Sequence, residues 1–189
     1  MNSDNIIIAR PKDSAGSGFV APKATTPPTD ASSSLPSAFK GLGWLGADGI
    51  KMVINRETTG LDAFGGDEVI KIQTKHSVQF VFKPLETLNK VVLTELLGDG
   101  NVDADGDTPT AARVTSDELS ERVWVFDCRI RNGMLCRVVL PKGAITAEGE
   151  MALKSDDAFA SELTVDAYSD ADGVKAYIYF ATAATASGE

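Results

Sequence analysis

The chain has 189 residues, a formal net charge of −9 and an ordinary balance of apolar and charged residues. This length predicts one domain, with a sizeable core and room for an arm. The acidic balance argues against a surface that grips nucleic acid, because phosphate binding needs clustered Lys and Arg.

The N-terminal region predicts an arm rather than a domain. Its longest strongly apolar run is residues 6–8, so we expect neither a signal peptide nor a membrane anchor, and synthesis in a cytoplasm that keeps the cysteines reduced. Residues 12–38 are dominated by small, polar and proline residues, which predicts a flexible arm over 1–38 that orders only against a partner. The domain is expected over 39–181, followed by a C-terminal tail over 182–189.

The segment GLDAFGGDEV, residues 60–69, combines an aromatic residue, a double glycine and carboxylates. It follows a predicted strand over 51–55, whose lead-in GWLG contains Trp44. Gly65 and Gly66 permit positive φ angles. Phe64 on a loop lowers solubility unless something receives it, which leaves two alternatives: a contact with the chain's own core, or docking onto another subunit.

Residues 69–83 alternate without a break, which predicts one long strand rather than an unmarked hairpin. One face is expected to carry Ile70, Ile72, Thr74, His76, Val78, Phe80 and Phe82. Pro84 ends the ladder, and residues 85–97 change to helical spacing. The helix is expected to bury Leu85, Leu88, Val92 and Leu96, with Thr87 as N-cap and Gly98 as C-cap.

Residues 101–107, NVDADGD, match the first half of a calcium loop, with oxygen ligands at Asn101, Asp103 and Asp105. The motif needs a Glu where this chain has Ala112, and Pro109 occupies another ligand position. The favoured interpretation is an acidic turn in water, with a calcium site as the alternative.

Asn132-Gly133 predicts a two-residue hairpin turn. That turn would pair Arg129 with Cys136 and put Cys128 opposite Arg137. The two sulfurs would then lie on opposite faces, so we expect structural thiols and no disulfide. Both faces of this hairpin carry apolar residues, so a second layer, the helix or a neighbouring subunit, is expected to cover one of them.

Further strands are predicted over 123–130, 135–140, 145–153, 159–168 and 174–180. Seven or more strands with one helix predict a mainly β fold: an antiparallel β-sandwich or partly closed barrel, with one flanking α-helix over about 85–97.

No constellation predicts an enzyme. His76 is the only histidine and shares the apolar register of its strand, which favours a core or interface position over a catalytic one. Glu148 and Glu150 could serve a glycoside hydrolase only within a polar, aromatic-lined cleft that the sequence does not indicate. We expect no catalytic residue, metal ligand or cofactor.

The order of several segments resembles the major tail tube protein of long-tailed bacteriophages, closest to those with flexible, non-contractile tails. These segments are LPSAFKGLGWLGADGI at 35–50, RETT at 56–59, AFGGD at 63–67, the long strand, and LETLN at 85–89. The resemblance is dense over about 35–100 and diffuse from there to the C-terminus.

The resemblance implies six copies in a ring, with rings stacked into a tube that conducts the genome and strands from all subunits joined into a tube-wide β-barrel. Residues 56–68 would be an inter-ring loop, and Leu61, Phe64, Gly65, Gly66 and Trp44 are the docking candidates. Expected partners are copies of the chain, a tape-measure protein, and tail-tip and terminator proteins, with no membrane. The location would be the virion tail, after synthesis in the bacterial cytoplasm.

Viral DNA would pass through the tube without specific binding. Because each chain carries −9, a ring of copies is strongly acidic, and a share of that charge on the inner wall would repel DNA. The lumen-facing candidates are Glu148, Glu150, Glu162 and Asp166. The alternative function is a calcium-dependent β-sandwich module for adhesion or carbohydrate binding.

Overall fold

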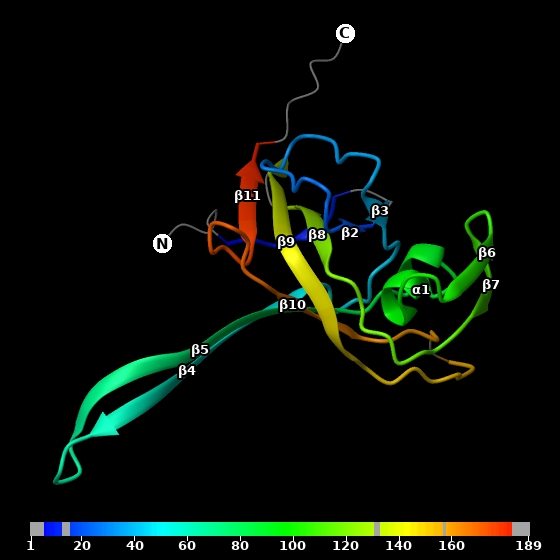
Figure 1. Ribbon diagram of the computed structural model, residues 1–189. Helices are drawn as coiled ribbons and strands as arrows, with labels where there is room; N and C mark the ends of the chain where they lie inside the picture. Colours follow the sequence, from blue (N-terminus) through cyan, green and yellow to red (C-terminus); the bar gives the residue numbers. More distant parts are fainter. Residues whose placement is uncertain (1–5, 13–15, 131–132, 157, 183–189) are drawn as a thin grey trace.

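The computed structural model describes residues 6–12, 16–130, 133–156 and 158–182 (Figure 1). Over these residues the elements, in chain order, are β1 (Arg10–Pro11), β2 (Gly18–Pro22), β3 (Lys40–Gly41), β4 (Lys51–Asp62), β5 (Glu68–Phe82), α1 (Lys90–Leu97), β6 (Val102–Asp105), β7 (Thr108–Ala112), β8 (Arg122–Arg129), β9 (Leu135–Glu148), β10 (Leu163–Ala167) and β11 (Tyr177–Ala181).

Nine of these strands form one antiparallel sheet in the order β3-β2-β8-β9-β10-β5-β4, with β1 beside β8 and β11 beside β9. β6 and β7 form a separate hairpin next to α1 (Figure 1). The expected mainly β, antiparallel architecture with one helix is confirmed for the described residues. The sheet of this single chain is not closed into a barrel.

β9 is continuous where the sequence predicts two strands. β8 pairs along one side of it, while β11 and then β10 pair along the other. The strand passes through Gly143, where a Cβ would lie 2.9 Å from Val165 Cγ1 and 3.1 Å from Trp124 Cδ1. The missing side chain therefore lets β8 and β10 pack closely, and Trp124 Nε1 donates to the Gly143 carbonyl at 3.2 Å.

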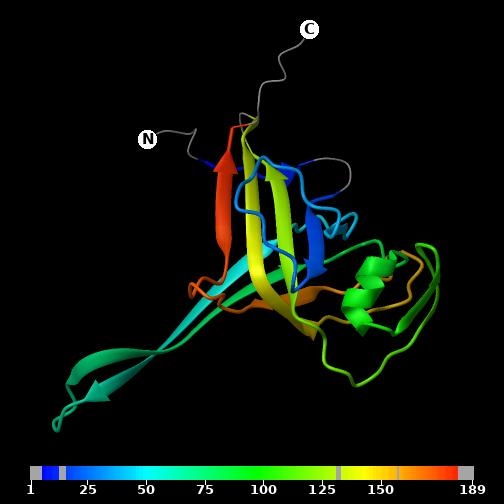
Figure 2. The same ribbon diagram turned by 45° about the horizontal axis from the view of Figure 1, so that its top comes forward.

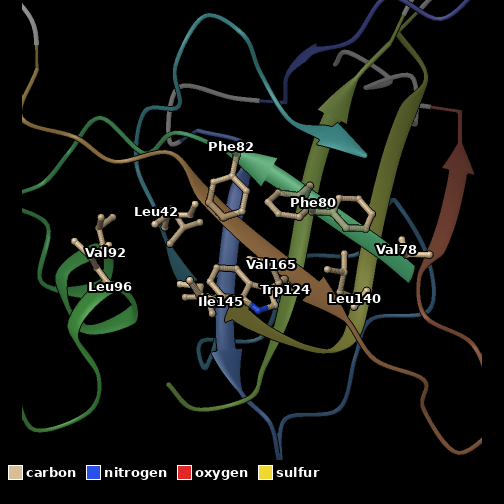
Figure 3. Packing of buried hydrophobic residues seen from close by; sticks show 14 residues of the cluster. Leu42, Val78, Phe80, Phe82, Val92, Leu96, Trp124, Leu140, Ile145 and Val165 are labelled. Atoms are coloured by element: carbon tan, nitrogen blue, oxygen red, sulfur yellow. The ribbon is translucent and has the colours of Figure 1, made fainter. Parts of the chain in front are cut away.

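The main core lies between β5 and β10 on one side and β8 and β9 on the other (Figure 3). Phe80 stacks on Phe126 with 5.8 Å between ring centroids, and Phe82 meets Phe126 edge to face at 5.2 Å. Trp124 is completely buried beside them. Burial of each large apolar side chain stabilises the fold by roughly 1.5–3 kcal/mol, so these aromatic residues hold the two sides of the bent sheet together.

The helix begins later than the sequence predicts. Asn89, not Thr87, is the N-cap, and its Oδ1 accepts a hydrogen bond from the Val91 N–H at 2.9 Å. The Thr87 hydroxyl instead donates to the Phe159 carbonyl, and residues before Asn89 form turns. Gly98 is the C-cap as predicted, with φ 93°. Because residue 88 precedes the helix, Leu88 is exposed rather than part of the buried stripe that contains Val92.

Part of the predicted arm belongs to the sheet. Residues 18–22 form β2, which pairs with β8 and buries Val20 and Ala21. This stretch orders without a partner subunit because its small apolar residues fill a position between β3 and β8, a pairing that composition does not reveal. Residues 1–5 and 13–15 of the predicted arm, and 183–189 of the predicted tail, lie outside the described residues.

A buried ion pair fixes the rest of that segment over the second face of β8 and β9. Arg137 makes a bidentate pair with Asp127, at 2.6 and 2.7 Å, and both are almost fully buried. Its guanidinium also donates to the carbonyls of Asp30 and Ser33, at 2.9 and 3.0 Å. The second apolar cluster, which includes Phe39, packs on the same face. The chain's own segment 30–39 therefore helps to cover the face for which we expected the helix or a neighbouring subunit.

The β8–β9 register differs by one residue from the prediction. Cys128 lies directly opposite Cys136, and Asp127 lies opposite Arg137. The Ile130 N–H donates to the Met134 carbonyl, so the connection has three residues, 131–133, instead of two. Asn132, on which the prediction rested, lies outside the described residues. The longer connection shifts every pair, and the two cysteines share a face instead of lying on opposite faces.

Candidate assembly surface

The β4–β5 hairpin projects from the body of the molecule (Figures 1 and 2). β5 extends over fifteen residues as one strand, which confirms the predicted long strand. Its last part enters the core through Val78, Phe80 and Phe82, whereas residues 57–75, the outer hairpin, are all exposed. Residues 56–62, expected as part of a loop, belong to β4, so the protruding element is a hydrogen-bonded two-stranded ribbon with a short tip.

A bulge in β5 changes which residues share a face. Glu57 pairs with Lys75 and Thr58 with Gln73, so Thr74 is an extra residue. The Thr74 hydroxyl donates to the Glu57 carbonyl at 3.2 Å. The sequence predicts one continuous apolar face along the strand. The bulge moves Ile70 and Ile72 to the face opposite Val78 and Phe80, because simple alternation does not survive an added residue.

The outer hairpin consequently has one apolar face, composed of Leu61, Ile70 and Ile72, which we call the hairpin face. Leu61 pairs directly with Ile70 across the ribbon. The three side chains are 60, 53 and 57% exposed. Contact with one another across the two strands shields these side chains from water only in part. Such a contiguous apolar surface on a protrusion indicates a docking site.

The hairpin tip carries the aromatic residue of GLDAFGGDEV. The Ala63 N–H donates to the Asp67 carbonyl at 2.8 Å and closes the turn. Gly65 and Gly66 have φ angles of 137° and 91°, which confirms that both use conformations that L side chains rarely adopt. Phe64 is fully exposed. The ring therefore makes no contact with the chain's own core, and docking onto another molecule stays a prediction.

Trp44 does not join the other docking candidates. It precedes β4, and its N–H donates to Glu86 Oε1 at 2.9 Å while its carbonyl accepts from the Leu85 N–H. The indole is largely exposed at the base of the hairpin, next to the end of β5. A fifteen-residue strand spans about 50 Å, so Trp44 and Phe64 occupy opposite ends of the ribbon.

The four acidic candidates lie along neighbouring strands, with Glu162 next to Gly149, between Glu148 and Glu150, and Asp166 further along β10. Glu162 lies 3.6 Å from Lys51, and Asp166 accepts a hydrogen bond from Gln79 Nε2 at 2.7 Å. Asp166 alternates with buried Val165 and Ala167, which puts it on the outer face of β10 and β5. Glu148 ends β9, where burial raises the pKa of its carboxyl, and Glu150 is exposed just beyond.

A groove beside α1 was not expected from the sequence. Its lining includes Leu85, Leu88 and Val91, with Glu95 and Arg122 at its wall. Arg122 Nε lies 2.9 Å from Glu95 Oε1, and Arg122 Nη2 lies 2.6 Å from an Asp99 oxygen. Burial raises the pKa of Glu95 to about 7, although Arg122 opposes the change. No periodic signal in the sequence marks this groove, because its lining comes from separate elements.

Residues 101–107, for which a calcium site was the alternative to an acidic turn, lie at and within the β-hairpin made by β6 and β7. Arg113 donates to both Asp103 oxygens at 2.6 and 3.0 Å, and its hydrogen bond lowers the pKa of that carboxyl. Asn101 Nδ2 donates to the Leu97 carbonyl and to the Thr115 hydroxyl. Among the residues described, no three His, Cys, Asp or Glu side chains gather as metal ligands would.

His76 lies in β5 opposite Arg56 and is half-buried, so it is not a core residue. Desolvation lowers its pKa, and the charges of Arg56 and Lys175 lower it further.

In the part of the chain that the structure describes, no helix is long and apolar enough to cross a membrane.

A mainly β subunit with a projecting apolar hairpin has the features of proteins that assemble with other copies or partners. The family described as phage tail tube protein matches residues 1–187, and the chain belongs to that family. It is therefore a structural protein of a bacteriophage tail, which confirms the resemblance seen in the sequence. A search among curated proteins found no match.

Proposed function

We propose that six copies of the chain close into a ring, and that rings stack through the β4–β5 hairpin into the tube of a long non-contractile tail. The observation that carries this proposal is the hairpin itself. Its apolar face and the exposed Phe64 have no counterpart surface within the chain's described residues. Burial of this surface against a neighbouring ring removes it from water and supplies the driving force for stacking.

Ring closure is supported by the edge strand β4, which ends the sheet order. Met52 and Ile54 lie opposite Phe80 and Val78 and continue the core face outward, yet they are 44 and 49% exposed. A strand of twelve residues with unpaired backbone groups on its outer side is a template for strand addition. Pairing with the next subunit would cover both features and extend the sheet toward a tube-wide barrel.

The tube is proposed to conduct the genome past an acidic inner wall, with Glu162 and Asp166 on the β10–β5 face and Glu148 and Glu150 at its end. Repulsion lets DNA slide without specific binding. The proposed partners are further copies, a tape-measure protein, and the tail-tip and terminator proteins. Assembly takes place in the bacterial cytoplasm, with no membrane involved.

Negative-stain microscopy of the concentrated protein tests the assembly. Hollow tubes whose averaged cross-sections show six subunits are the expected result. A chain that stays monomeric at every concentration, with no tube in virions or on tail initiation complexes, contradicts it. The wall is tested separately with Glu162→Lys and Asp166→Lys combined. These tubes should form but retain added DNA at low salt, whereas DNA retention equal to the parent's contradicts an inward position.

A further inference from the structure

Cys128 and Cys136 occupy the centre of a row that crosses four strands. Pro11 of β1 pairs with Cys128, Cys128 pairs with Cys136, and Cys136 pairs with Phe180 of β11. Both terminal strands therefore join the sheet beside the cysteines. Directly opposed residues on antiparallel strands share a face, with Cα atoms about 4.5–5.5 Å apart. That separation falls in the range of about 4.4–6.8 Å that a disulfide needs.

The surroundings leave both thiols available. Both cysteines are free and only half-buried. The neighbouring Asp127–Arg137 pair projects to the other face, so a bond between the sulfurs would not disturb that buried network. Desolvation raises the pKa of Cys128 to about 11 and also raises the pKa of Cys136, so little thiolate exists at neutral pH.

We propose that Cys128 and Cys136 form an oxidisable dithiol that closes into an intrachain disulfide with a small disulfide oxidant such as oxidised glutathione. One cysteine loses its proton and attacks an oxidant sulfur, which forms a mixed disulfide and releases one glutathione thiol. The second cysteine loses its proton, attacks the first cysteine's sulfur and releases the other glutathione. The protein gives up two electrons and two protons, and the oxidant ends as two thiols.

The disulfide would tie the end of β8 to the start of β9, next to the points where β1 and β11 attach. In a cytoplasm the pair stays reduced, and after release of the particle it oxidises. This second statement rests on the proposed function; the chemistry of the purified chain does not.

The test is peptide mapping of the full chain, without reductant, after incubation with excess oxidised glutathione at mildly alkaline pH. The expected product is one peptide pair joined through Cys128 and Cys136, lighter by two hydrogen atoms, with no free thiol. Cys128→Ser and Cys136→Ser should each instead accept one glutathione. Persistent free thiols, separate glutathione adducts on both cysteines, or cross-linked dimers would overturn the proposal.

Two further measurements separate the consequences. The oxidised chain should melt roughly 5 °C above the reduced chain, while Cys136→Ser shows no oxidant-dependent shift. An unchanged melting temperature contradicts the stabilising role. Particles mapped without reductant should contain the bond. Its absence there, with the bond present in the purified chain, would overturn only the link to the virion.

Discussion

Both halves of β5 carry large apolar side chains, but the surroundings of the two halves differ. The inner half contributes Val78, Phe80 and Phe82 to a core that is closed by β8, β9 and β10. The outer half contributes Ile70 and Ile72 to a ribbon that has only β4 beside it. The same strand thus begins as an exposed protrusion and ends as the centre of the fold.

Under the proposed function, this difference separates the residues that fold the chain from those that would assemble it. A two-stranded ribbon is only marginally stable in water, so the outer hairpin contributes little to the stability of the body. Its apolar side chains would instead lower the free energy of the proposed assembly when they are buried in it. Changes in the body should therefore alter unfolding, and changes in the hairpin should alter polymerisation.

The largest effect is expected from Arg137→Ala in the body. It leaves Asp127 buried without its partner and removes the donors to Asp30 and Ser33. The free energy of unfolding should fall by about 3–5 kcal/mol in urea denaturation. The matched control is Lys75→Ala, which breaks the exposed Lys75–Glu57 pair of the hairpin, 3.2 Å long, and should cost less than about 1 kcal/mol. Equal losses of unfolding free energy in the two variants would contradict the view that the body, and not the hairpin, determines stability.

The next effect is a pH dependence at Glu95. Its carboxyl has a pKa near 4.5 in the unfolded chain and about 7 in the folded one. The folded state therefore binds more protons between these values, and the stabilisation is complete below about pH 4.5 and lost as pH rises through 7. Relative to the parent, Glu95→Gln should gain about 2–3 kcal/mol in unfolding free energy between about pH 5 and pH 8. If the difference in unfolding free energy between Glu95→Gln and the parent does not change with pH, the raised pKa of Glu95 is contradicted.

In the hairpin, Leu61→Asp should prevent assembly without unfolding the chain. A carboxylate on the hairpin face would be buried without a partner on docking, so the critical concentration for polymerisation should rise at least about 30-fold. Sedimentation of assembled material measures it. Thr58→Asp adds the same charge on the opposite face of the same strand and should have a much smaller effect. If both variants polymerise equally poorly, charge rather than the hairpin face is responsible.

Phe64→Ala should give the smallest change. The unfolding free energy is expected to stay within about 0.5 kcal/mol of the parent, because the ring contacts no part of the described body. The critical concentration should rise about 10-fold through the lost apolar contact. Val114→Ala, at an exposed apolar residue in the loop after β7, should change neither quantity. If Phe64→Ala instead unfolds the chain, Phe64 stabilises the fold and the docking role is contradicted.

The sequence is sufficient where one local signal dominates. The alternation over residues 69–83 identified the long strand, Gly98 ended the helix, and Gly65-Gly66 marked the tip. Segment order also identified the family. These features depend on neighbours in the chain, so pattern and propensity report them directly.

The errors arose where a distant contact decides the outcome. The bulge at Thr74 depends on how β4 pairs with β5, and no residue type announces it. β2 is ordered because β8 offers it an edge. Cys128 lies opposite Cys136 because the connection between β8 and β9 is one residue longer than predicted. Each is a pairing decision between segments, and a one-residue change in pairing reverses the faces of a strand.

The most direct test of the account is photocrosslinking from the hairpin tip. Phe64 is replaced by benzoylphenylalanine, and isotopically labelled and unlabelled chains are mixed before assembly and irradiation. The account predicts adducts that join labelled to unlabelled peptides in assembled tubes and are absent from the monomer. Adducts within a single chain, or tubes without any adduct at this position, would contradict the assignment of the hairpin as the contact between subunits.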